Sequence, residues 1–126
     1  MSHSVLTPAD LQTLLQRPAE RHGPLVIDVR PARLYRRSHI PGSHHLPSGL
    51  LVSSELPDQD LVLVAEDDQR AMVLRHTLHQ RGFHRQIHHL QGGLAAWVQA
   101  GHPLQPAPRS SRPRPLVRQL LRRRAA

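Results

Sequence analysis

The side chains best suited to chemistry lie in one short segment, residues 65–70, between an apolar run and a helical pattern. The segment places three carboxylates and one guanidinium behind an alanine, in the order Ala65, Glu66, Asp67, Asp68, Gln69 and Arg70. Carboxylates at a helix start either cap the helix and stabilise its positive end, or hold a basic group that approaches from outside. The same carboxylates repel a dianion, so the side chains of this segment disfavour an anionic substrate.

A second pair of charged residues, Asp28 and Arg30, lies at the end of the apolar run that starts at Leu25. Open α/β sheets bind ligands at the carboxyl ends of their strands, so this pair could edge a pocket together with Arg70. For Asp28 and Arg30 we expect a structural role, in which hydrogen bonds between them fix the following loop. For Arg70 two roles stay open, an ion pair with a nearby carboxylate and the binding of an anion.

Eleven histidines raise the question of a metal site, above all the pairs at 44–45 and 88–89 and the spacing of His76 and His79. Neighbours in a strand point to opposite faces, and two histidines one helical turn apart supply only two ligands. The chain has no cysteine, so no thiolate completes such a set. We therefore expect solvated histidines, no metal and no cofactor.

The elements that must position these residues alternate between helix and strand. In chain order we predict a helix from Pro8, strands at 25–29 and 61–64, a helix at 69–80, a strand at 87–90 and a helix at 92–100. Thr7 before Pro8 is typical of a helix start, and Gly82 is typical of a helix end. The apolar β-branched runs indicate strands buried on both faces, so the fold class is α/β with a parallel sheet. Trp97 is expected in the core.

Three motifs occur in one order along this frame: LVIDVR at 25–30, HIPGS at 39–43 and LQGGLAAW at 90–97. Together they resemble the rhodanese family of sulfurtransferases, with Ser38 in place of the family's first glycine in G-H-I-P-G-A. The resemblance extends over residues 5–104. It implies a single rhodanese-like domain, residues 1–104, whose central parallel sheet is flanked by helices on both faces.

The resemblance also assigns the segment 65–70 to the family's active loop, C-x-x-x-x-R. Ala65 takes the place of the cysteine that carries the persulfide, and Arg70 matches the arginine that binds substrate. Sulfur transfer needs a thiolate, which no carboxylate of the loop and neither methionine of the chain can replace. The related phosphatase branch has a loop one residue longer, so the spacing argues against that activity. We therefore predict that sulfurtransferase activity is absent.

The charge of the chain is concentrated in its last part, residues 105–126, which we expect to form a basic tail. Residues 1–102 hold ten arginines and nine acids, whereas residues 103–126 hold seven arginines and no acid. Five prolines between 103 and 115 indicate an extended linker, and the segment after them has the pattern of a short amphipathic helix. The residues expected to make contacts there are Leu116, Leu120, Leu121, Arg118, Arg122, Arg123 and Arg124.

A binding or regulatory module without catalysis is the function that these features favour. The tail predicts a protein partner, with an anionic membrane surface or nucleic acid as alternatives, and the acidic loop could receive a basic segment such as this tail. A disordered, solubilising terminus, or a helix packed against this same domain or a second copy, stays open as well. The alternative function is a sulfurtransferase-type enzyme that uses a group other than cysteine or a partner's thiol. No signal peptide or membrane span is recognised, so we expect a cytoplasmic protein.

Overall fold

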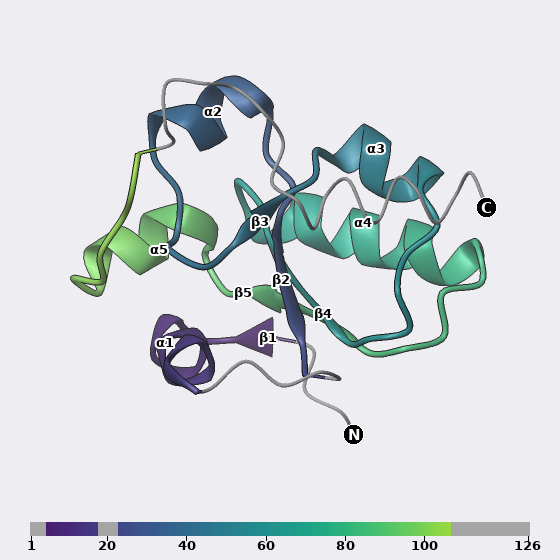
Figure 1. Ribbon diagram of the computed structural model, residues 1–126, viewed down its shortest axis with the longest axis horizontal. Coiled ribbons are helices and arrows are strands. Elements are labelled where there is room, and N and C mark those ends of the chain that lie inside the picture. The colour runs from purple at the N-terminus through teal and green to yellow at the C-terminus, as the bar shows by residue number, and fades with distance from the viewer. Residues whose placement is uncertain (1–4, 18–22, 107–126) are drawn as a thin grey trace.

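A computed structural model of the chain describes residues 5–17 and 23–106 (Figure 1). Its strands are β1 Val5–Leu6, β2 Leu25–Asp28, β3 His44–His45, β4 Leu61–Val64 and β5 Ile87–Leu90. They form one parallel sheet in the order β1-β5-β4-β2-β3, which confirms the predicted α/β class. In a parallel sheet the carboxyl ends of all strands meet at one edge, so the loops that follow β2 and β4 lie side by side.

The centre of the sheet is built from the two apolar runs that the sequence singled out. Every residue of β2 and β4 is buried, and the strands pair from Leu25 opposite Leu61 to Asp28 opposite Val64. A strand covered on both faces needs such a continuous apolar run. The two edge strands, β1 and β3, have two residues each and were not predicted, because so short a segment carries no periodic pattern.

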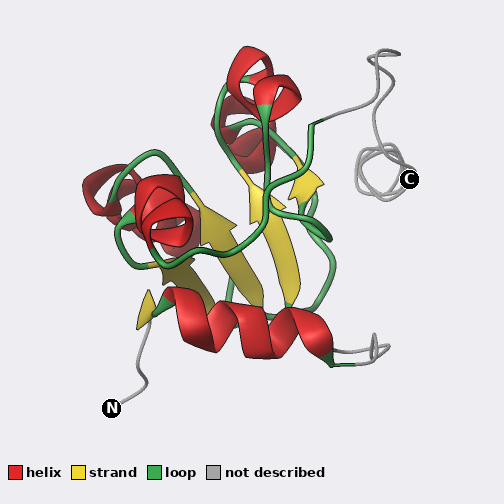
Figure 2. Cartoon of the chain, turned by 90° about the vertical axis from the view of Figure 1, so that its left-hand side faces the viewer, coloured by secondary structure: helices red, strands yellow, loops and turns green. Residues whose placement is uncertain are grey.

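Helices cover both faces of the sheet, as predicted (Figures 1 and 2). They are α1 Pro8–Gln16, α2 Ala32–Arg37, α3 Ser48–Ser53, α4 Asp68–Gln80 and α5 Gly93–Gln99. On one face α3 and α4 contribute Leu51 and Leu78 to a core cluster, and on the other α1 and α5 contribute Leu11 and Trp97. Trp97 is fully buried, and its indole nitrogen donates a hydrogen bond to the carbonyl of Pro103 at 2.8 Å.

The helix ends follow from the residues that the sequence placed there. Thr7 and Asp10 form a capping box, in which each side chain accepts the backbone N–H of the other residue at 3.1 to 3.2 Å. Asp67 caps α4, since its Oδ1 accepts the N–H of Arg70 at 2.8 Å. Beyond α4, Gly82 has φ of +98°, a conformation that glycine adopts without the steric cost of a Cβ.

The expectation of solvated histidines is wrong for two of the nine that the structure describes. His39 is fully buried, its Nδ1 donates to the carbonyl of Tyr35 at 3.0 Å, and the two rings stack at 3.9 Å. His89 is 2% exposed and faces α4. Within residues 5–17 and 23–106, no three histidine or acidic side chains are placed to hold a metal ion, and no helix could cross a membrane.

Candidate functional site

The segment 65–70 leaves the middle of the sheet, where β4 ends beside the loop that follows β2. The N–H of Val29 donates to the carbonyl of Val64 at 3.0 Å, which holds the two loops together. Between them opens a cleft of about 780 Å³, here called the Ala65 cleft. Its lining includes Val29, Arg30, Pro47, Ala65, Val73 and Leu74. Ala65 directly follows β4 and is 4% exposed. The only side-chain group that it contributes to the cleft lining is a methyl group.

Gly93, at the start of α5, fixes the backbone of the loop from behind. Its φ is +64°, and a Cβ at this position would lie 2.7 Å from the carbonyl oxygen of Glu66 and 2.8 Å from that of Ala65. A residue with a side chain would therefore push the loop out of place and adopt an unfavourable backbone conformation. The second glycine of the LQGGLAAW motif is explained by this close approach.

Arg70 turns back onto the acidic residues of its own loop. Its Nη1 lies 2.8 Å from Glu66 Oε1, and its Nε lies 3.6 Å from Asp67 Oδ2. Its side chain is 64% exposed, so solvent screens both ion pairs. Of the two roles left open by the sequence, the ion pair is the one found in this structure. The loop carries three carboxylates and this one guanidinium. Of these, Glu66, Asp67 and Arg70 line the cleft and give it a net charge of −1.

Asp68 has a different task, because it ties the loop to β5 and α5. Its Oδ1 accepts the N–H of Gly92 at 2.9 Å and lies 3.1 Å from His89 Nε2. On the other side of the ring, Arg75 Nη1 lies 3.3 Å from His89 Nδ1. A guanidinium only donates and a carboxylate accepts, so His89 is assigned as the neutral form with its proton on Nε2.

Burial lowers the pKa of His89, and the nearby positive charge of Arg75 lowers it further against the opposing effect of Asp68. Burial also lowers the pKa of Arg75. These contacts were not predicted from the sequence, because His89 and Asp68 are 21 residues apart and meet only when β5 packs under α4. The neutral His89 stiffens the start of α4 without adding charge to it.

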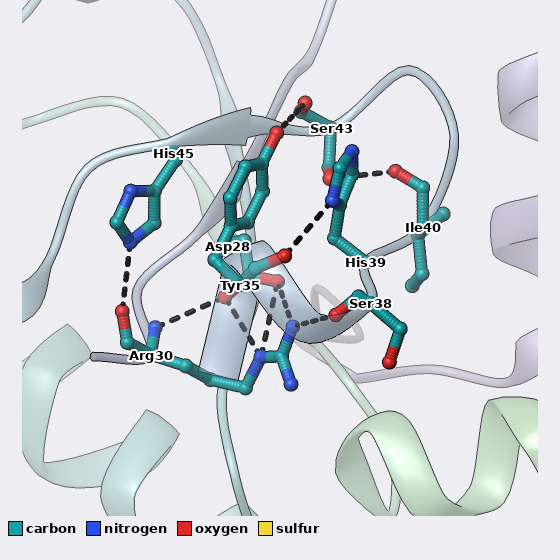
Figure 3. A network of polar contacts seen from close by, with 8 residues as sticks. All are labelled: Asp28, Arg30, Tyr35, Ser38, His39, Ile40, Ser43 and His45. Atoms are coloured by element: carbon teal, nitrogen blue, oxygen red, sulfur yellow. Dashed lines mark hydrogen bonds and ion pairs between the residues drawn. The ribbon is translucent and has the colours of Figure 1, made fainter. Parts of the chain in front are cut away.

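Asp28 and Arg30 form a buried corner next to the cleft (Figure 3). Arg30 Nε lies 3.0 and 3.1 Å from the two carboxylate oxygens of Asp28, and Arg30 Nη2 lies 2.8 Å from Oδ2. The same Nη2 donates to the carbonyl of Ser38 at 2.7 Å, and the backbone N–H of Arg30 donates to Asp28 Oδ1. The guanidinium therefore already has hydrogen-bond partners in Asp28 and Ser38, although Arg30 also lines the cleft.

Tyr35 supports this corner from α2, as Figure 3 shows. Its ring lies between those of His39 and His45, at centroid distances of 3.9 and 4.4 Å, and its hydroxyl donates to the carbonyl of Ser43. His45 Nε2 donates to the carbonyl of Arg30 at 2.9 Å. The HIPGS motif is thus held against α2 through His39 and Ser43, which both contact Tyr35.

The predicted site residues fall into three groups. The first group, Arg30 and every residue of the loop 65–70 except Asp68, lines the Ala65 cleft. The second group, Asp28 and Asp68, does not line it, since Asp28 is fully buried and Asp68 contacts His89 and Gly92. The predicted tail contacts lie outside the described residues, as does the expected helix that contains them.

Comparison with known proteins agrees with this architecture. The family model of the rhodanese-like domain matches residues 7–100. A protein of Allochromatium vinosum named sulfurtransferase is 32% identical over 98 residues, which cover 75% of this chain and 91% of that protein. A Synechocystis protein is 34% identical over 101 residues, which span 54% of its length. The rhodanese-like domain of an Anabaena protein has a TM-score of 0.70 and 27% identity, covering 90% of this chain and 86% of that domain. The chain belongs to the rhodanese-like family, and it is a member without any cysteine.

Proposed function

We propose that this chain is a rhodanese-like binding module that does not transfer sulfur. The observation that carries the proposal is the alanine at position 65, whose methyl group takes the place of the thiol at the edge of an otherwise intact cleft. A methyl group can neither accept a sulfane sulfur nor hold it as a persulfide. The carboxylates beside it are poor nucleophiles toward sulfur.

The charges around the cleft disfavour the binding of an anionic substrate, which supports the proposal. A family substrate such as thiosulfate is a dianion, and here Glu66, Asp67 and Arg70 line the cleft with a net charge of −1. Arg70 is paired with Glu66 and Asp67, and Arg30 is paired with Asp28, so neither guanidinium is free of a competing carboxylate. A basic or apolar partner fits such a cleft better than an anion does.

A second candidate is a sulfurtransferase that works with a thiol supplied by a partner. The relative named sulfurtransferase, at 32% identity, is the observation that favours it. In that reaction the partner's thiolate would enter the Ala65 cleft and attack the sulfane sulfur of thiosulfate. The S–S bond of thiosulfate breaks, sulfite leaves, and the partner's sulfur holds the persulfide. Sulfur transfer that appears only when a cysteine-bearing partner is added would support this candidate over the first.

Affinity capture from the native lysate tests the binding role. The bait is the full chain, compared with a full-length variant in which Arg118, Arg122, Arg123 and Arg124 are replaced by Gln. We expect one protein to be retained in a stoichiometric amount at moderate salt, and its loss from the variant would assign the contact to the tail. Capture of only lipid or nucleic acid, released by salt, would replace the protein partner with those alternatives. No retained partner of any kind would contradict the proposal.

A further inference from the structure

We propose that the Ala65 cleft is the docking site of the chain's own basic segment, residues 116–124. The inference rests on the proposed function, because a working sulfurtransferase would need this cleft open to its substrate. It adds an intramolecular contact to that function, in which residues 116–124 bind in the Ala65 cleft of the same chain.

The first argument is the apolar surface that the cleft leaves uncovered. Val73 lines the cleft and is 61% exposed, and its neighbour Met72 is 57% exposed. The cleft continues inward to Val29, Ala65 and Leu74. Adjacent exposed apolar side chains beside an apolar hollow are typical of a surface that packs against another segment.

The second argument is charge. Glu66, Asp67 and Arg70 line the cleft with a net charge of −1, and Asp28 neutralises Arg30. Residues 116–124 carry four arginines and no acid. The other exposed arginines near this part of the chain, on α2, do not line the cleft. Opposite charges on the two surfaces favour their association.

The third argument is reach. Gln105, close to the end of the described chain, exchanges two backbone hydrogen bonds with His39 at 2.8 and 2.9 Å. The neighbouring carbonyl of Ser38 binds Arg30, which lines the cleft. Nine residues separate Pro106 from Leu116, and a proline-rich linker of that length spans about 28 Å. A domain of this size has a radius of gyration of about 13 Å, so the segment can reach the cleft.

The fourth argument is the pattern of the segment itself. In a helix, Leu116, Val117, Leu120 and Leu121 share one face. Arg118, Arg122 and Arg123 lie outside that face, and only Arg124, at the end of the segment, falls on it. So short a helix is not stable alone in water and needs a surface to fold against. The docked helix would place its leucines over Val73 and its arginines toward Glu66 and Asp67.

A spin label on the segment measures this contact directly in the full chain. The chain has no cysteine, so Gln119→Cys provides a single attachment point on the polar side of the expected helix. We expect the nitroxide to broaden the amide signals of residues 65–74, and added salt to reduce this broadening. Broadening elsewhere on the domain, or none above that of free nitroxide, would overturn the proposal.

Two pairs of matched variants test the contacts. Glu66→Gln with Asp67→Asn removes two charges while asparagine keeps the cap of α4, and Glu55→Gln is the control at an exposed acid outside the cleft. Val73→Ser removes apolar surface, and Val98→Ser is the control on α5, where Val98 is 50% exposed. The first double change should reduce the equilibrium constant for docking about fivefold, as expected for two exposed ion pairs. Equal broadening in the variants and their controls would overturn the docking site.

A mixture of two differently labelled samples distinguishes docking within one chain from docking between two copies. Labelled chain without isotope is combined with isotope-enriched chain without label, so that only contacts between copies broaden signals. We expect no broadening in the mixture. Broadening of residues 65–74 only in the mixture would overturn the intramolecular contact and assign the segment to a second copy. Neither result depends on sulfur transfer, so the proposed function and this inference can fail separately.

Discussion

Two ion pairs beside the same cleft, Asp28–Arg30 and Glu66–Arg70, have equal lengths of 2.8 Å and opposite surroundings. The side chains of the first are 0% and 6% exposed, whereas those of the second are 33% and 64% exposed. The first pair is enclosed by backbone carbonyls and stacked rings, and it holds the loop after β2. The second lies at the solvent-exposed loop 65–70. The pair that holds the loop after β2 is therefore buried, whereas the pair at the rim of the cleft is exposed to solvent.

The largest effect should come from breaking the buried pair. Arg30→Met removes the guanidinium at similar volume and leaves the carboxylate of Asp28 buried without it, which we expect to cost about 3–5 kcal/mol of unfolding free energy. Arg70→Met, the matched change in the exposed pair, should cost less than about 1 kcal/mol. Urea unfolding of both variants gives the comparison. Equal losses of unfolding free energy in the two variants would contradict the distinction between the buried and the exposed ion pair.

A smaller effect is expected where α5 meets the loop. Gly93→Ala places a Cβ against the carbonyl oxygens of Ala65 and Glu66 and imposes a positive φ on alanine, at about 2–3 kcal/mol. Gly49→Ala in α3 is the control, because no atom lies within 4 Å of its added Cβ, and there the change should stabilise slightly. Thermal unfolding separates the two. A neutral Gly93→Ala would show that the loop tolerates displacement.

The contact between Asp68 and His89 predicts that the unfolding free energy depends on pH. Burial and Arg75 lower the pKa of His89 below its unfolded value, so the unfolded chain takes up the proton first. This contribution to stability is present above about pH 6.5 and is lost as the pH falls below it. His89→Gln should flatten the decline in unfolding free energy between pH 7 and 5. The exposed His76→Gln should leave it unchanged, and identical curves for both variants would exclude His89 as the cause.

The smallest effect concerns the charge of the loop 65–70. Glu66→Gln removes one exposed partner of Arg70 and should change the unfolding free energy by about 0.2–1 kcal/mol, less at high salt. Denaturant titrations at low and high salt measure it. A larger, salt-independent loss would mean that Glu66 supports the loop structurally, as Asp68 does.

Sequence patterns predicted the centre of this fold well and its margins poorly. The continuous apolar runs of β2 and β4 and the capped ends of α4 depend on local chemistry, so they were readable from residues alone. The two-residue strands and the short α2 and α3 depend on what packs beside them. The same holds for Asp68 and His89, whose contact joins distant parts of the chain. The one sequence signal for this contact was His89, a polar residue at a buried position of β5.

The central claim, that Ala65 has ended sulfur transfer, is tested most directly by thiosulfate:cyanide turnover of the full chain. The wild-type protein, which has no cysteine, should give no rate above the reaction without protein. Ala65→Cys in the same assay reports whether the loop can still use a thiol, and a gain of turnover would show that only the nucleophile was missing. Turnover by the wild-type protein itself, well above that of a free thiol, would contradict the account.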